Sequence, residues 1–194
     1  MRESALAMFE YVMVLASIIV GLGLTHLLLG VSHLVTSAGG AKPYWIHLVW
    51  VGYMFLTSVM WWWFEFRFRA VDVWTFQLYL FVLVYAFIIY LMCAWLFPEK
   101  ADEHGGYKNY FYSRRIWFFG LLAAYLLIDL VDTLLKGPAH FMSLGLEYPI
   151  ATLLFTILAI VAAMIRNERY HAVFAVVCLA YQFSWTFRYA LTLN

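Results

Sequence analysis

The chain has 194 residues, of which 66% are hydrophobic and 12% are charged, and its mean hydropathy is +0.84. Soluble domains carry about 45–50% apolar and about 25% charged residues, so this composition excludes a water-soluble globular protein. It also excludes intrinsic disorder, because a chain this apolar would not stay unfolded in water. The formal net charge of +1 provides no basic excess for binding a nucleic acid. We therefore expect a multi-pass integral protein of the cell (inner) membrane, with the lipid bilayer as its surroundings.

Long apolar stretches divide the chain into segments that can each cross a bilayer, which takes about 20 residues. Because the stretches are continuous, they favour helices over the alternating ten-residue segments, roughly, of a membrane β-barrel. The sequence predicts an all-α integral membrane protein with a single transmembrane domain over residues 1–194, folded as a six-transmembrane-helix bundle. The predicted spans are residues 5–35, 44–64, 73–97, 116–135, 149–165 and 172–191, and residues 98–115 form a polar loop.

Lysine and arginine residues near the ends of the spans predict the orientation, because cytoplasmic loops carry an excess of them. The loops after the first, third and fifth spans hold Lys42, Lys100, Lys108, Arg114, Arg115, Arg166 and Arg169. The opposite side holds Arg2, Arg67, Arg69 and Lys136, with Arg188 just inside the last span. The bias favours loops 1, 3 and 5 in the cytoplasm and both termini outside.

The fourth span carries a stripe of polar side chains. Tyr125, Asp129, Asp132 and Lys136 follow one another at intervals of four, three and four residues, so they share one helix face. Ionisable side chains inside a span are costly and normally face the bundle or a water-filled cavity. The stripe therefore indicates either the entrance of a transport pathway or a polar helix end at the membrane surface.

Two other charges lie at a similar depth on the same side of the membrane and extend the pathway hypothesis. The candidate pathway residues are Glu10, Tyr125, Asp129, Asp132 and Arg188. Because Asp129 and Arg188 lie at a similar depth, we expect an ion pair between them. If the stripe is only a helix end, we expect Asp132 to pair with Lys136 and Arg188 to extend to the headgroups.

The first span carries a second stripe, formed by Gly23, His26, Gly30 and His33 at intervals of three, four and three residues. Histidine is a haem ligand, a metal ligand or a proton carrier, and glycines beside it leave room for a flat macrocycle. His26 and His33 are therefore candidate haem ligands. The alternative is a histidine hydrogen-bonded to a neighbouring helix, with the glycines present for close packing.

A divalent metal is the second candidate cofactor. Three histidines near the ends of spans are its candidate ligands: His33, His47 and His171. The polar loop offers another set of metal-ligand types, in Glu99, Asp102, Glu103 and His104, but their spacing matches no defined metal-binding loop. Cys93 and Cys178 each lie in an apolar run and predict neither a disulfide nor a zinc site.

Three functional hypotheses follow. The first is a small channel- or transporter-type protein that moves an ion, a proton or a small solute, and that forms a homo-oligomer because six helices enclose little volume. The second is a haem- or metal-binding redox protein that uses His26 and His33, and the third is a non-catalytic assembly or signalling subunit. The sequence contains no Gly-x-Ser-x-Gly, no His-Glu-x-x-His and no phosphate-binding glycine loop, so we predict no catalytic residues.

Overall fold

The computed structural model describes residues 2–36, 42–98 and 105–189. The long helices are α1 (Arg2–Thr36), α2 (Trp45–Glu65), α3 (Phe76–Ala94), α4 (Tyr107–Leu135), α6 (Glu147–Met164) and α7 (Glu168–Tyr189). The 3-10 turn η1 (Phe66–Ala70) follows α2, and the short helix α5 (Pro138–Ser143) follows α4. The described residues contain no strand, so the predicted all-α fold is confirmed for them.

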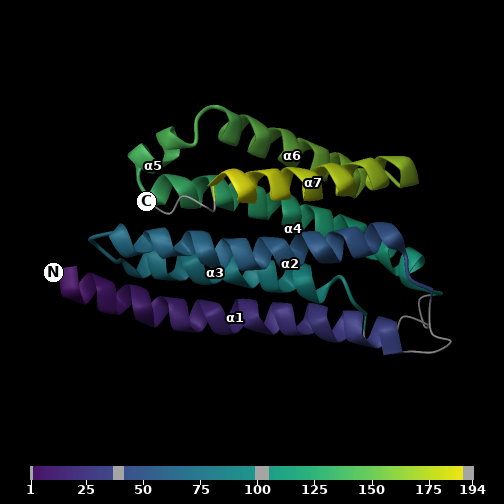
Figure 1. Cartoon of the computed structure of the whole chain (residues 1–194), viewed down its shortest axis with the longest axis horizontal. Helices are drawn as coiled ribbons and strands as arrows, with labels where there is room; N and C mark the ends of the chain where they lie inside the picture. The colour runs from purple at the N-terminus through teal and green to yellow at the C-terminus, as the bar shows by residue number, and fades with distance from the viewer. Residues whose placement is uncertain (1, 37–41, 99–104, 190–194) are drawn as a thin grey trace.

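Four of the long helices are long and apolar enough to cross a membrane, namely α1, α3, α4 and α6. This agrees with the prediction of a membrane protein. Helices α2 and α7 run alongside these four in the same bundle (Figure 1). A crossing by all six helices is taken up below as a proposal.

The long helices form two groups that meet along α2 and α7. Helix α1 packs mainly along α3, helix α4 packs mainly along α6, and α2 contacts α7. The beginning of α1, the turn η1, helix α5 and the end of α7 all lie at one end of the bundle, here called the α5 end (Figure 1). The beginnings of α2, α4 and α7 lie at the opposite end.

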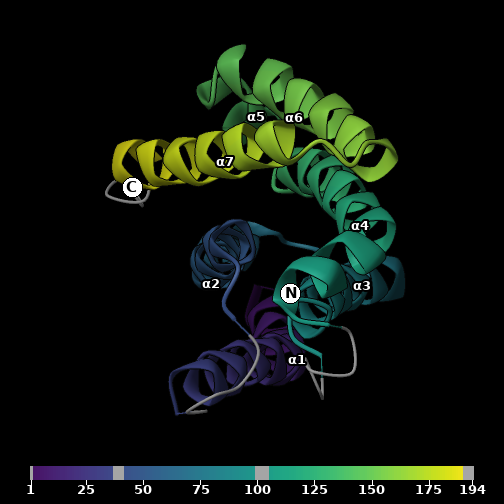
Figure 2. The same cartoon turned by 90° about the vertical axis from the view of Figure 1, so that its right-hand side faces the viewer.

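Helices α6 and α7 leave a common hairpin at the opposite end and diverge toward the α5 end (Figures 1 and 2). Near the hairpin the space between the helices is filled by an aromatic plug, formed by Trp50, Phe118, Phe119 and Phe174. The ring centroids of Trp50 lie 5.3 to 5.5 Å from those of the three phenylalanines, mostly edge to face. Such contacts are favourable beyond the area that they bury. The bundle is therefore closed at the opposite end and looser at the α5 end.

Helix α4 begins at Tyr107, inside the segment that we predicted as a polar loop. Tyr107, Tyr110 and Phe111 are buried, whereas Lys108 and Asn109 face outward. The first turns of α4 are therefore amphipathic, and burial of their aromatic side favours the helix. The short helix α5 was not predicted either, although Pro138 at its first position is typical of a helix start.

The glycine stripe of α1 faces the end of α3 and the turn that follows it. A Cβ atom at Gly30 would lie 2.2 Å from Cγ of Phe97, whose ring is buried. A Cβ atom at Gly23 would lie 3.3 Å from Cα of Tyr90. The glycines therefore permit a close approach between α1 and α3, as small residues do in membrane helices.

The close approach makes a matched pair of substitutions informative. We expect Gly30→Ala to destabilise the protein by about 1–3 kcal/mol, because the buried Phe97 ring must move. Gly21 lies on the same helix, and a Cβ atom added there would have no atom within 4 Å. We therefore expect Gly21→Ala to leave the stability of the protein unchanged or to raise it slightly. Thermal unfolding of the purified protein in detergent measures both. An equal Tm for the two variants would contradict this account of the stripe.

Candidate functional site

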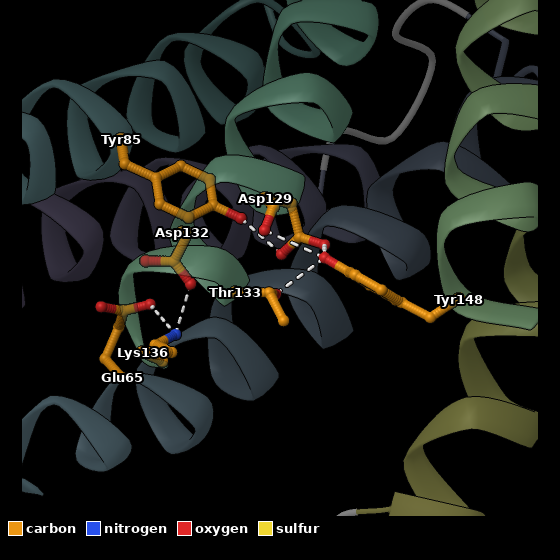
Figure 3. A network of polar contacts seen from close by, with 7 residues as sticks. All are labelled: Glu65, Tyr85, Asp129, Asp132, Thr133, Lys136 and Tyr148. Carbon is orange, nitrogen blue, oxygen red and sulfur yellow. Dashed lines mark hydrogen bonds and ion pairs between the residues drawn. The ribbon is translucent and has the colours of Figure 1, made fainter. Parts of the chain in front are cut away.

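A buried cluster of charges joins the ends of α2 and α4 at the α5 end (Figure 3). Glu65 is the last residue of α2, Asp132 lies in the last turn of α4, and Lys136 caps α4. The Lys136 ammonium donates to Oε1 of Glu65 at 2.8 Å and to the carboxylate of Asp132. It also lies 5.0 Å from the centroid of the buried Phe68 ring. One buried ammonium group therefore forms ion pairs with two buried carboxylates.

Burial makes this cluster sensitive to any imbalance of charge. The side chains of Lys136, Glu65 and Asp132 are only 4%, 1% and 2% exposed. Oε2 of Glu65 and Oδ1 of Asp132 are buried and have no hydrogen-bond partner. Because two carboxylates face one ammonium, the three groups carry one surplus negative charge when all are ionised. A single proton on either carboxyl group would balance the cluster.

Asp129 lies one turn before Asp132 on the same face of α4, and two other helices hold its carboxylate (Figure 3). The Tyr85 hydroxyl of α3 donates to Oδ1 at 2.8 Å, and the Tyr148 hydroxyl of α6 donates to Oδ2 at 2.6 Å. The Tyr148 hydroxyl also lies 2.8 Å from Oγ1 of Thr133. Two tyrosine donors fix the position of the carboxylate and stabilise its charge without neutralising it.

A cavity of about 360 Å³, here called the outer cavity, opens at the α5 end beside these groups. Its polar lining includes Arg67, Asp129, Asp132, Lys136 and His140. A smaller space of about 70 Å³, here called the inner pocket, lies deeper between α2, α4, α6 and α7. Three residues line both spaces: Asp129, Tyr148 and Trp185. The two spaces therefore adjoin at these three residues, and together they are here called the path.

The arrangement of α6 and α7 explains why the path is open at one end only. Near the hairpin, the His171 ring of α7 packs 5.2 Å from the Phe119 ring of α4. Toward the α5 end, where α6 and α7 diverge, long aromatic side chains connect them, with 5.6 Å between the ring centroids of Trp185 and Tyr148. The space between α4 and α7 therefore begins beyond the aromatic plug and widens toward Asp129.

The structure places the charged pathway candidates in separate surroundings. The expected ion pair between Asp129 and Arg188 is wrong, because the Arg188 guanidinium binds both oxygens of Glu147 at 2.6 and 2.7 Å. Glu147 begins α6 directly opposite the end of α7, so it is the nearer carboxylate. Asp132 pairs with Lys136, as the helix-end interpretation predicted.

Glu10 and Tyr125, the remaining pathway candidates, differ in position. Glu10 is exposed on α1 and lines a surface groove with Trp62 and Arg69, away from the cavity residues of α4. Tyr125 lines the inner pocket, and its ring packs 5.4 Å from the ring of Tyr85. The structure thus brings Tyr125, Asp129 and Asp132 together and leaves Glu10 outside.

The histidines of α1 do not form a haem site in the described structure. Nε2 of His26 lies 3.2 Å from the carbonyl oxygen of Phe97, and His33 is exposed. The Phe97 ring fills the space beside Gly30 that a macrocycle would need. These contacts favour the alternative interpretation, in which His26 bonds to a neighbouring segment and the glycines serve packing.

The candidate metal ligands bind separate backbone groups. Nε2 of His47 lies 2.6 Å from the carbonyl of Leu96, and Nε2 of His171 lies 3.0 Å from the carbonyl of Ile165. Over residues 2–36, 42–98 and 105–189, no group of three His, Cys, Asp or Glu side chains is placed to hold a metal ion. The other expected ligand set, Glu99, Asp102, Glu103 and His104, lies outside the described residues.

Sequence reasoning missed three members of the site. Glu65 looked like a charge at a helix end, whereas Tyr85 and Tyr148 are two of fourteen tyrosines with no distinguishing spacing. A carboxylate at the end of a long apolar run was the only signal for Glu65, and the nearby Arg67 and Arg69 offered more obvious partners than Lys136. No local signal marks the tyrosines, because their partner is Asp129 of another helix.

Comparisons with protein families, with curated proteins and with solved structures found no match to this chain. The function must therefore be inferred from the geometry of the chain itself. That geometry is a fixed carboxylate on the wall of a one-ended path, beside a buried and unevenly compensated charge cluster.

The charge cluster predicts a large effect of removing its cation. We expect Lys136→Met to cost about 3–5 kcal/mol of stability, because Glu65 and Asp132 stay buried without a counter-charge. We expect the double variant Lys136→Met/Asp132→Asn to recover part of the loss. Lys108→Met provides the control, since the Lys108–Glu168 pair is about half exposed and contributes no more than about 1 kcal/mol. Equal Tm values for Lys136→Met and Lys108→Met would refute this role of the cluster.

His140 of α5 predicts an acid-sensitive contribution to stability. Burial, followed by the positive charges of Arg67 and Lys136, lowers the pKa of His140 from 6.5 to about 4. The unfolded chain therefore binds the proton more readily, so this contribution is complete above pH 6.5 and is lost as the pH falls toward 4. We expect the Tm of the wild type to fall more between pH 7 and pH 4.5 than that of His140→Gln. An equal fall in Tm between pH 7 and pH 4.5 for the two proteins would contradict the lowered pKa of His140.

Proposed function

We propose that the protein is a membrane transport protein of the channel or transporter type, and that it moves an ion, a proton or a small solute. One observation carries this proposal: Asp129, a carboxylate inside the apolar helix α4, lines both the outer cavity and the inner pocket. Ionisable groups at this depth are costly and commonly mark a substrate or proton pathway. A carboxylate needed only for packing would not need to line two adjoining spaces.

The architecture of the bundle supports the same proposal. We take all six long helices to cross the bilayer, because α2 and α7 lie between the four apolar helices and alternate with them in direction (Figure 1). The path is open at the α5 end, and the aromatic plug closes it at the opposite end. A path closed at one end is one of the two states that alternating access requires. We infer that Trp50 and Phe119 must move apart for transport.

The orientation follows from the basic residues. Lys108, Arg166 and Arg169 lie near the beginnings of α4 and α7, at the opposite end of the bundle. By the positive-inside rule this end faces the cytoplasm, so the outer cavity opens to the outside of the cell. We further propose a homo-oligomer, because exposed apolar side chains cover much of α1 and α6. The bilayer and a second copy of the chain are the partners that such surfaces fit.

A flux measurement tests the proposed function directly. Purified protein in liposomes is tested for proton flux with an internal pH dye, and for uptake of a panel of radiolabelled inorganic ions, small amines and small neutral solutes. We expect flux above that of empty liposomes for at least one of these, and a loss of at least tenfold with Asp129→Asn, which removes the charge on the path at nearly constant shape.

Glu168→Gln is the matched control for this test, because it also converts a carboxylate to an amide. Glu168 lies at the opposite end and accepts hydrogen bonds from Tyr44 and Lys108. We expect its flux to equal that of the wild type. No flux of any probe, or equal flux in wild type and Asp129→Asn, would overturn the proposal and favour an assembly or signalling subunit.

A further inference from the structure

The inner pocket has the chemistry of a binding site for one class of ligand. We propose that it binds an organic ammonium ion, with the positive nitrogen beside Asp129. This inference uses the path of the proposed function as a binding site and deepens that proposal by naming its substrate class. Binding itself does not require that the protein transports anything.

Charge is the first argument. Asp129 is the one carboxyl group among the described residues that line the inner pocket. Its oxygens accept hydrogen bonds from tyrosine hydroxyls, and it makes no salt bridge within the described part of the chain. Lys136 binds Glu65 and Asp132, and Arg188 binds Glu147. Arg67 lines the outer cavity and forms no ion pair with Asp129. The counter-charge of Asp129 must therefore come from a bound cation or a proton.

The aromatic wall is the second argument. Six rings line the inner pocket around Asp129: Tyr53, Tyr125, Tyr148, Phe155, Tyr181 and Trp185. Faces of aromatic rings attract cations, and sites lined by several rings are the usual means of binding quaternary ammonium groups. Trp185 already holds one cation, because the Arg188 guanidinium lies 5.5 Å from its ring centroid. The rings therefore add a cation-specific attraction to the charge of Asp129.

The same wall disfavours a hard metal cation. Ca²⁺ takes six to eight oxygen ligands, and Mg²⁺ requires nearly ideal octahedral geometry. The inner pocket supplies one carboxylate, and the hydroxyls of Tyr85 and Tyr148 already donate to it. Leu122, Leu126 and Phe155 add apolar surface to the lining, whose other polar groups are Gln182 and Thr152, and the Thr152 hydroxyl donates to the carbonyl of Tyr148. An ammonium ion that carries methyl or methylene groups satisfies both the carboxylate and this apolar surface.

The sizes of the two spaces set the mode of binding. The inner pocket, at about 70 Å³, holds an ammonium head with a few methyl groups, and the outer cavity, at about 360 Å³, holds the rest of the molecule. Arg67 lines the outer cavity and forms no ion pair within the described part of the chain, so it disfavours a second positive charge on the ligand. The ligand is therefore a monovalent cation that enters head first and leaves a polar or neutral tail outward.

Equilibrium binding to the full-length protein in detergent tests this inference, with choline as the cationic probe. Its neutral analogue is 3,3-dimethylbutan-1-ol, in which a carbon atom replaces the nitrogen at constant shape. By isothermal titration calorimetry we expect choline to bind at least tenfold more tightly than the alcohol. Equal affinity for the two probes, or no binding of choline, would overturn the inference. This comparison needs no variant and therefore does not depend on the folding of one.

Two variants then locate the site. We expect Asp129→Asn to weaken choline binding at least tenfold and Trp185→Leu to weaken it about threefold to tenfold. Trp185→Phe keeps a ring and should retain most of the affinity, and Glu168→Gln should bind choline as the wild type does. Equal choline affinity in wild type and Asp129→Asn, with unchanged Tm, would place the ligand elsewhere and refute the inference.

The binding and flux measurements separate the two proposals. Choline binding that depends on Asp129, without flux of any probe, supports the ammonium site and overturns the transport proposal. Flux that depends on Asp129, without choline binding, supports transport and overturns the ammonium site.

Discussion

Two carboxylates from different helices form ion pairs with one buried lysine, and these ion pairs hold the ends of α2 and α4 together at the α5 end of the bundle. Lys136 connects Glu65 at the end of α2 with Asp132 on α4, in surroundings that are almost closed to water. Charges that are buried must be paired, so the ends of these two helices cannot separate without leaving a charge uncompensated. Phe68 of η1 packs under the ammonium and fixes the turn that follows α2. The polar wall of the outer cavity depends on this connection.

The helices around the cavity differ in how firmly they are held. Tyr148 connects α6 to α4 through Asp129 and Thr133, with hydrogen bonds that are buried or nearly so. The end of α7 is held by an exposed ion pair, Glu147–Arg188, and by ring contacts of Trp185. Exposed ion pairs contribute little to stability, so the end of α7 is the least restrained wall of the cavity. A ligand that reaches the path by moving one helix would displace α7 at the smallest cost.

The sequence predicted the features that depend on local periodicity. Spacings of three and four residues placed Tyr125, Asp129, Asp132 and Lys136 on one face of α4, and the structure puts Asp129 and Asp132 on the wall of the cavity. The continuous apolar stretches likewise predicted the helical class. These signals are local because a helix repeats every 3.6 residues whatever lies around it.

Features that depend on contacts between helices could not be predicted in the same way. Depth in the membrane suggested Arg188 as the partner of Asp129, but depth does not determine how a helix is rotated about its axis. The rotation of α7 brings Arg188 to Glu147 instead, and Asp129 receives two tyrosines from α3 and α6. Tyrosine is common in this chain and carries no charge, so the sequence does not indicate which tyrosines contact Asp129.

The short distance along α4 between Asp129 and the charge cluster couples their occupancies. A cation beside Asp129, as proposed above, and a proton on Glu65 or Asp132 would carry the same sign, and Asp129 and Asp132 lie about one helical turn apart in a medium that screens poorly. Each therefore disfavours the other, and by linkage the effect is equal in both directions. A cation that enters from the outer cavity would promote release of this proton into that cavity, which Asp129 and Asp132 both line. If Asp129 binds a cation as proposed, this geometry would favour exchange of the cation for a proton over independent binding of either.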